Sequence, residues 1–185
     1  MHHRAKQTNQ GLRELYHVHV KTNTNTDVNS TTNSANELYS RADVQVMRHA
    51  EEARCAGKDR VTEIAEYARK SGIKRIGIAC CMSLKKEALA LEQMLNQEFS
   101  VTLIDCKVGN LSKQQLIGEE YSGIACNPAQ QAQILADADT ELNISLGLCI
   151  GHDIVFNSKS KAPVTNLIVK DRQHHHNPYK IFEKI

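Results

Sequence analysis

Residues 75–104 read RIGIACCMSLKKEALALEQMLNQEFSVTLI, and this stretch decides the fold. One short apolar run occupies 75–80 and a second occupies 101–104. Between them the sequence predicts a helix from Ser83, with four apolar residues on one side: Leu84, Ala88, Leu91 and Leu95. A strand, a helix and a further strand in this order favour a right-handed crossover between two parallel strands.

The same alternation continues through the second half of the chain. Asn127-Pro128 predicts a helix start, and apolar runs at 142–148 and 164–169 predict two more strands, with a short helix after Gly151 between them. Four such strands with helices on both faces make a small doubly wound α/β domain, Rossmann-like or flavodoxin-like in type. The segment 109–126 is long enough to be a functional lid or a small extra element.

Two helices are expected before the first strand. Ser34 and Glu37 form a capping box for the first, and Gly57 ends it. Asp59 begins the second, which stops at Gly72. Residues 1–33 are rich in Asn, Thr and Ser, so we expect them to be a poorly packed leader, followed by a single domain over 34–185.

Composition excludes several classes of protein. A formal charge of +2, 4% aromatic residues and no Trp give no case for a nucleic-acid partner. No apolar stretch approaches the roughly 18 residues of a membrane span, and the first residues do not form a secretory signal. We therefore expect a cytoplasmic protein without a nucleic-acid or membrane partner, whose six cysteines are free thiols.

The positions of the cysteines give the first indication of function. Cys80 and Cys81 end the first predicted strand, while the others on this edge follow later strands or precede a helix: Cys106, Cys126 and Cys149. Ligands of doubly wound sheets bind at the carboxyl ends of the strands. We expect the Sγ atoms of Cys81, Cys106, Cys126 and Cys149 to fall inside one sphere of about 10 Å diameter, with Cys55 outside it.

Clustered thiolates select zinc, copper(I) or iron–sulfur clusters. One Zn²⁺ ion needs sulfurs about 3.8 Å apart, whereas neighbouring strands lie about 4.8 Å apart and second neighbours about 10 Å. Cysteines on three strand ends therefore favour a multinuclear cluster over one zinc ion. The ordinary alternative is that each free cysteine is a small buried hydrophobe.

A second hypothesis is a thiol-dependent enzyme. Cys126 precedes a helix N-terminus, whose dipole stabilises a thiolate. Cys149 or Cys126 would be the nucleophile, His152 the base and Asp153 the group that orients the imidazole. Alternatively, His152 and Asp153 only cap the short helix. A third hypothesis is a domain without catalytic activity that binds a partner through an apolar surface.

His174-His175-His176 is most simply a solvated run, although His176 follows the fourth strand and so reaches the cysteine edge. Lys107 and Lys161 are candidates for binding an anion, but single lysines are usually solvated. The ligand expected from the residues alone is a metal ion or a small molecule.

Six ordered motifs resemble one known family: RIGIACC (75–81), CKVG (106–109), CNP (126–128), GLCIGHD (147–153), SKAPVTNLIVKDR (160–172) and HNP (176–178). The chain is identified as a member of domain-of-unknown-function family eighteen forty-seven, whose proteins are commonly described as metal-binding. The resemblance implies a set of functional residues: Cys81, Cys106, Cys126, Cys149, His152, Asp153 and His176. It assigns Cys80 to an ordinary apolar position. Family members typically begin with a four-cysteine segment, whereas this chain has no cysteine before Cys55.

From these observations the sequence predicts a protein that binds zinc or an iron–sulfur cluster. The expected ligands are Cys81, Cys106, Cys126, Cys149, His152 and His176.

Overall fold

The computed structural model describes residues 35–54 and 57–184 of the chain. The chain divides into two units, 1–41 and 42–185, and the α/β fold belongs to the second. The expected leader, Ser34 of the capping box and Cys55 all lie outside the described residues. In the described part of the first unit, Ala35–Leu38 forms a 3₁₀ turn.

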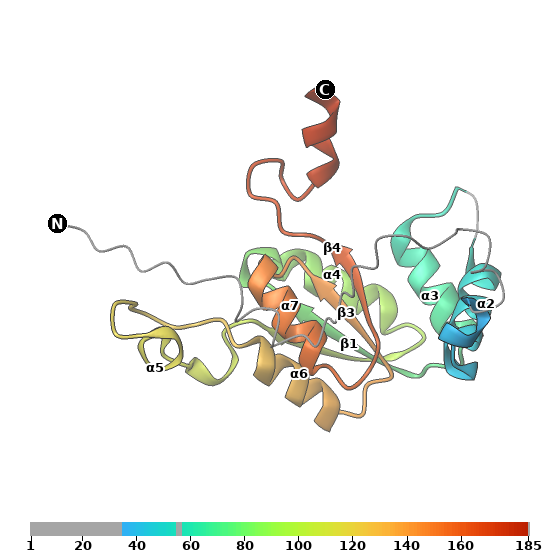
Figure 1. Ribbon diagram of the computed structural model, residues 1–185, viewed down its shortest axis with the longest axis horizontal. Helices are drawn as coiled ribbons and strands as arrows, with labels where there is room; N and C mark the ends of the chain where they lie inside the picture. The colour runs from blue at the N-terminus through green and yellow to red at the C-terminus, as the bar shows by residue number, and fades with distance from the viewer. Residues whose placement is uncertain (1–34, 55–56, 185) are drawn as a thin grey trace, which may run out of the picture. The chain divides into compact units, whose positions relative to one another are not determined.

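The four predicted strands form one parallel sheet in the order β2-β1-β3-β4 (Figure 1). Their bounds are β1 Arg75–Cys80, β2 Ser100–Asp105, β3 Leu142–Leu146 and β4 Val164–Ile168. The chain runs from β1 to its neighbour β2 and then crosses to β3 on the other side of β1. The strand order therefore reverses next to β1, and the carboxyl ends of β1 and β3 border the crevice where such sheets bind ligands.

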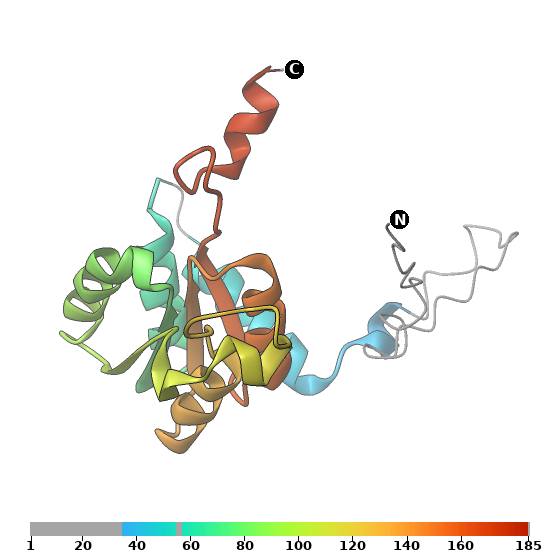
Figure 2. The same cartoon turned by 90° about the vertical axis from the view of Figure 1, so that its left-hand side faces the viewer.

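Helices cover both faces of the sheet, which confirms the predicted doubly wound α/β class (Figures 1 and 2). Their bounds are α2 Arg41–Ala53, α3 Arg60–Lys70, α4 Lys85–Leu95, α5 Lys113–Ile117, α6 Pro128–Asp137 and α7 Ile150–Lys159. Short 3₁₀ turns occupy Met82–Leu84, Val108–Asn110 and Pro178–Lys184. Helices α3 and α4 pack on one face of the sheet, and α6 and α7 pack on the other.

The sheet has one hydrophobic core on each face, and β1 contributes side chains to both. This follows because successive side chains of a strand point to opposite faces. Ile76, Ile78 and Cys80 lie in the core under α3 and α4, and Ala79 lies in the core under α6 and α7. A side chain at Gly77 would meet the Cδ atoms of Leu135 on α6 at 2.8 and 2.9 Å. Glycine therefore lets α6 approach the sheet closely.

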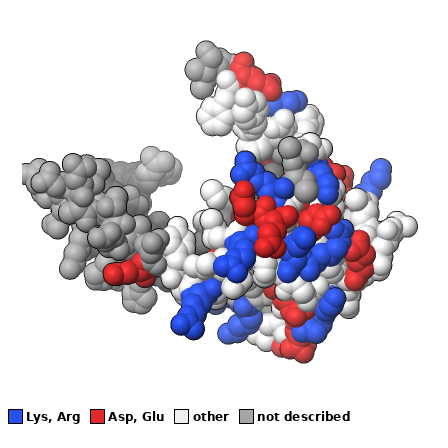
Figure 3. Space-filling model, turned by 90° about the vertical axis from the view of Figure 1, so that its right-hand side faces the viewer, with Lys and Arg blue, Asp and Glu red and all other residues white. Residues whose placement is uncertain are grey.

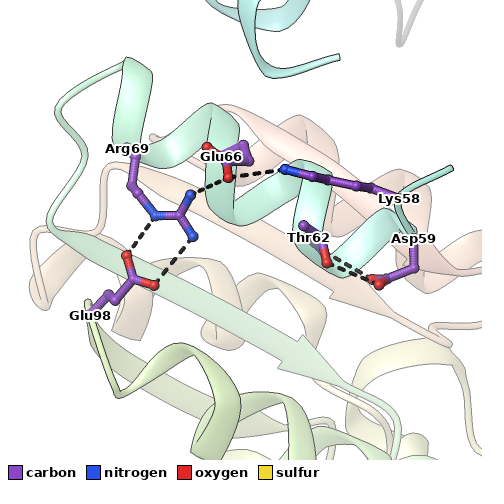
Figure 4. Close-up of polar contacts among 6 residues, drawn as sticks. All are labelled: Lys58, Asp59, Thr62, Glu66, Arg69 and Glu98. Atoms are coloured by element: carbon purple, nitrogen blue, oxygen red, sulfur yellow. Dashed lines mark hydrogen bonds and ion pairs between the residues drawn. The ribbon is translucent and has the colours of Figure 1, made fainter. Parts of the chain in front are cut away.

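Side-chain contacts fix both ends of α3 (Figure 4). Asp59 caps its first turn by accepting from the backbone N–H of Thr62 at 3.0 Å, as the sequence predicted. At the other end, Arg69 pairs with Glu98 and Glu66, each at 2.6 Å. Because Glu98 lies just before β2, this pair ties α3 to the start of an edge strand.

The described surface has two features that bear on function. No helix among residues 35–54 and 57–184 has both the length and the apolarity needed to cross a lipid bilayer. On the face drawn in Figure 3, basic and acidic side chains are interspersed. That face therefore carries no large patch of one charge.

Replacing Gly77 with Ala should lower the free energy of unfolding by about 1–3 kcal/mol, because the added methyl group overpacks the contact with α6. The methyl group would also fall on the Asn143 side chain, which is buried and already hydrogen-bonded to Thr140 and Ser160. Chemical denaturation measures the change. Gly151→Ala is the matched control, because no atom lies within 4 Å of its added methyl group. Equal stability of the two variants would contradict the close approach of α6.

Candidate functional site

Three cysteines each follow one of three neighbouring strands of the sheet, β2, β1 and β3. Cys81 comes directly after β1, Cys106 comes directly after β2, and Cys149 lies at the N-cap of α7, shortly after β3. Since the strands are parallel, all three residues lie at the carboxyl edge. This is the edge that the sequence predicted.

The fourth cysteine reaches the edge through the long loop between β2 and α6. This loop contains α5, so it is the small extra element that the sequence allowed (Figure 2). An antiparallel bridge between Ser112 and Ile124 closes it. The N–H of Asn127 then donates to the carbonyl of Cys106 at 2.8 Å. Cys126 is thereby held next to Cys106, although 20 positions separate them.

Cys106 and Cys126 form a thiol pair with their Sγ atoms 3.6 Å apart. The backbone N–H of Met82, after β1, donates to Cys106 Sγ at 3.4 Å. Cys106 is only 2% exposed, while Cys126 is half-buried. Burial, together with the nearby thiols of Cys126 and Cys81, raises the pKa of Cys106 to about 12.

Cys81 lies among polar groups. Its Sγ is 3.3 Å from Ser83 Oγ and accepts from Lys170 Nζ at 3.4 Å. Lys170 also donates to Ser83 Oγ at 2.5 Å, so the three side chains form a closed triangle. Burial raises the pKa of the Cys81 thiol, but hydrogen bonds from Ser83 and Lys170 outweigh burial and bring it below its ordinary value.

A second cation contacts Cys149. Arg172 donates from Nη2 to Cys149 Sγ at 3.1 Å. His152, half-buried in the first turn of α7, has a lowered pKa because of burial and the positive charges of Lys107 and Arg172. Burial and these two cations therefore favour the neutral imidazole.

The Asp153 carboxylate accepts hydrogen bonds from side chains other than His152. Its Oδ1 accepts from Ser145 Oγ at 2.6 Å and from Asn157 Nδ2 at 3.3 Å. The carboxylate thus links α7 to β3, and the contacts of the described residues give it no hydrogen bond to His152. The role of orienting the imidazole gains no support from this geometry.

The histidine run after β4 folds on itself. The ring of His174 is buried with Nδ1 3.0 Å from Asp171 Oδ2, while the ring Nδ1 of His176 accepts from the Asp171 N–H at 3.2 Å. His175 is exposed. The sequence interpretation of a solvated run therefore missed the buried position of His174.

Cys80 is fully buried in the core under α4, and burial raises its pKa to about 11. It lies where the family resemblance placed an ordinary apolar residue. Its side chain and that of Cys81 leave β1 on opposite faces, so only Cys81 belongs to the thiol site.

Among the described residues, no three His, Cys, Asp or Glu side chains are arranged as a group that could hold a metal ion. The structure brings Cys106 and Cys126 into contact, whereas Cys81 and Cys149 each contact a cation. Sequence reasoning missed Lys170 and Arg172. The available signal was their position shortly after a parallel strand, which places both residues at the carboxyl edge of the sheet.

Three cations, Lys107, Lys170 and Arg172, lie near the thiols, and no ion pair among residues 57–184 joins any of them to an acidic side chain. Lys107 instead donates from Nζ to the carbonyl of Ile124 at 2.6 Å. The positive charge at this edge is therefore available to a negatively charged group.

Two comparisons with known proteins match this chain. A family model described as "Protein of unknown function (DUF1847)" matches residues 17–167. An uncharacterized protein from Methanocaldococcus jannaschii is 44% identical over 124 residues, which cover 65% of this chain and 64% of that protein. The matched region thus spans somewhat less than two thirds of the length of the curated relative.

Lys170→Gln should shift alkylation of Cys81 to higher pH in metal-free protein. The thiolate reacts, and the present pKa lies below the ordinary thiol value, so thiolate forms earlier as pH rises. Removing the Lys170 ammonium raises that pKa and moves the midpoint upward. Iodoacetamide rates at Cys81, followed by peptide mass spectrometry across a pH series, measure the shift. Lys161→Gln, at an exposed lysine, should leave the profile unchanged.

Proposed function

The chain belongs to the DUF1847 family of proteins of unknown function, and from its thiol site we propose that it binds a soft metal ion or an iron–sulfur cluster. Cys106 and Cys126 are the first ligands, and Cys81 and Cys149 complete the set of thiolates. His152 and His176 are the candidates for a remaining position or for a hydrogen bond to a ligand.

The observation that carries this proposal is the 3.6 Å distance between the Sγ atoms of Cys106 and Cys126. Two thiolates on one tetrahedral Zn²⁺ ion are about 3.8 Å apart, so this pair already has the separation of two ligands. Cys81 is close enough for its charge to raise the pKa of Cys106. Cys81 lies directly after β1, next to the end of β2 where Cys106 lies, so it is the nearest candidate for a third ligand.

Electrostatics also support the proposal. Four thiolates outweigh the positive charge of a zinc ion or a common iron–sulfur cluster, so the complex remains negative. Lys170 already contacts Cys81 and Arg172 already contacts Cys149. Because no acidic side chain among the described residues pairs with either cation, both are available to neutralise such a complex.

Binding requires the carboxyl edge to adjust. Arg172 now donates to Cys149 Sγ and would have to turn away from one lone pair for a metal to bind there. The pair formed by Cys106 and Cys126 needs less movement, since the Asn127 N–H already fixes the backbone between them. We infer that the metal binds this pair first.

Purified anaerobically, the full chain should contain zinc or iron with sulfide, as measured by metal analysis and the visible spectrum. Cys106→Ser and Cys126→Ser should each weaken the affinity for the metal by more than the roughly 10–100-fold that loss of an outer-shell partner costs, because each removes a ligand. Cys80→Ala is the matched control, since that thiol lies on the other face of β1. A colourless, metal-free protein under anaerobic conditions contradicts the proposal, as does an equal loss in the control.

A thiol-dependent enzyme is the second candidate, and the contact between Arg172 and Cys149 at 3.1 Å favours it. Cys149 also occupies the N-cap position of α7, and its side chain makes no capping hydrogen bond there. In this alternative Cys149 or Cys126 is the nucleophile and His152 is the base. The neutral imidazole fits that role because a base must be unprotonated to accept a proton.

For this alternative, iodoacetamide near neutral pH should label Cys149 or Cys126 far faster than the remaining cysteines. His152→Gln should slow the fast site, whereas His175→Gln, at an exposed histidine, should not. Peptide mass spectrometry assigns the rates. Uniformly slow labelling would remove the enzyme hypothesis and leave metal binding unaffected.

A further inference from the structure

We propose that Cys106 and Cys126 are a redox-active dithiol that exchanges with small disulfides. The Sγ atoms are 3.6 Å apart, whereas a disulfide bond is about 2.05 Å long. Among the described cysteines, Cys106 and Cys126 are the two whose Sγ atoms contact each other. Cys81 and Cys149 contact cations instead. The two sulfurs therefore have to approach each other by about 1.5 Å to form the bond.

The backbone already holds the reduced thiols together. The hydrogen bond from Asn127 N–H to the Cys106 carbonyl is 2.8 Å long. The bridge between Ser112 and Ile124 closes the loop that separates the cysteines. Since the fold has already closed this loop, joining the sulfurs loses little further chain entropy. The effective concentration of one thiol at the other is correspondingly high.

The two thiols differ in access, and this sets their order of reaction. Cys106 is 2% exposed, while Cys126 is half-buried. A small disulfide in solution therefore meets Cys126 first. Cys106 is then in position to attack the sulfur of Cys126.

The exchange is balanced in two steps. The Cys126 thiolate attacks one sulfur of the small disulfide, forms a mixed disulfide and releases one small thiolate. Cys106 then attacks Cys126 Sγ and displaces the second small thiolate, which takes up the Cys106 proton, because the buried Cys106 has little contact with solvent. Overall, two protein thiols are oxidised by two electrons, and one small disulfide is reduced to two thiols.

This activity needs no metal and goes beyond the proposed function. The two properties are mutually exclusive at one moment, because a sulfur in a disulfide is no longer a thiolate ligand. Oxidation of the pair should therefore prevent metal binding. The dithiol would then make metal occupancy depend on the thiol–disulfide balance.

The test uses the full chain, reduced and freed of metal with a chelator, and then incubated with oxidised glutathione. Peptide mapping without reductant should find a Cys106–Cys126 bridge as the main disulfide, reversed by dithiothreitol. Cys106→Ser should instead accumulate glutathione on Cys126, because the attacking thiol is missing. Cys126→Ser should form neither product at this pair, and Cys80→Ala should form the bridge as the unchanged chain does.

A main bridge to another cysteine, or no bridge, overturns the dithiol proposal. So does a Cys106→Ser variant that accumulates no mixed disulfide at Cys126. Metal analysis of the reduced chain is independent of these results. Metal binding without a bridge refutes only the dithiol, and a bridge without metal binding refutes only the proposed metal site.

Discussion

The structure depends on the parallel hydrogen bonding of β1 to both β2 and β3. This pairing puts β1 between two neighbours, so its alternating side chains must satisfy two separate cores. Ile76, Ile78 and Cys80 pack under α3 and α4, and Ala79 packs under α6. The same pairing aligns the carboxyl ends of the strands. A residue directly after β1 or β2 therefore lies at the common carboxyl edge. In this chain both of those residues, Cys81 and Cys106, are cysteines.

The sequence was sufficient to predict the sheet because its signals were local. β1 agrees with its predicted bounds at both ends, and α6 begins at Pro128 after the expected Asn127 cap. The periodic apolar pattern fixes such elements without knowledge of their neighbours. The expected early helix was less well predicted: its cap was expected at Ser34, but α2 begins at Arg41, and the apolar residue Val46 in this helix is exposed. A face pattern alone does not say whether a partner surface is present.

The site was predicted less completely, because its contacts link distant parts of the chain. The sequence assigned Cys81, Cys106, Cys126 and Cys149 to one edge, but spacing could not predict which sulfurs touch. That outcome depends on the path of the loop between β2 and α6, and in particular on the hydrogen bond from Asn127 to Cys106. Lys170 and Arg172 were missed for a similar reason, since a charged residue after a strand is usually solvated.

Unequal environments give the four thiols different chemistry within one site. Burial opposes ionisation of Cys106, whereas Lys170 and Ser83 favour the thiolate of Cys81. In the proposed complex, a metal ion that replaces the proton on Cys106 would supply positive charge at the sulfur, and would so relieve the cost of burying that thiolate. Oxidation removes the same cost differently, because a disulfide carries no charge. The two proposals, metal ligation and disulfide formation, would thus both remove the same free-energy cost. That cost is the charge of a Cys106 thiolate, which the fold buries beside Cys126.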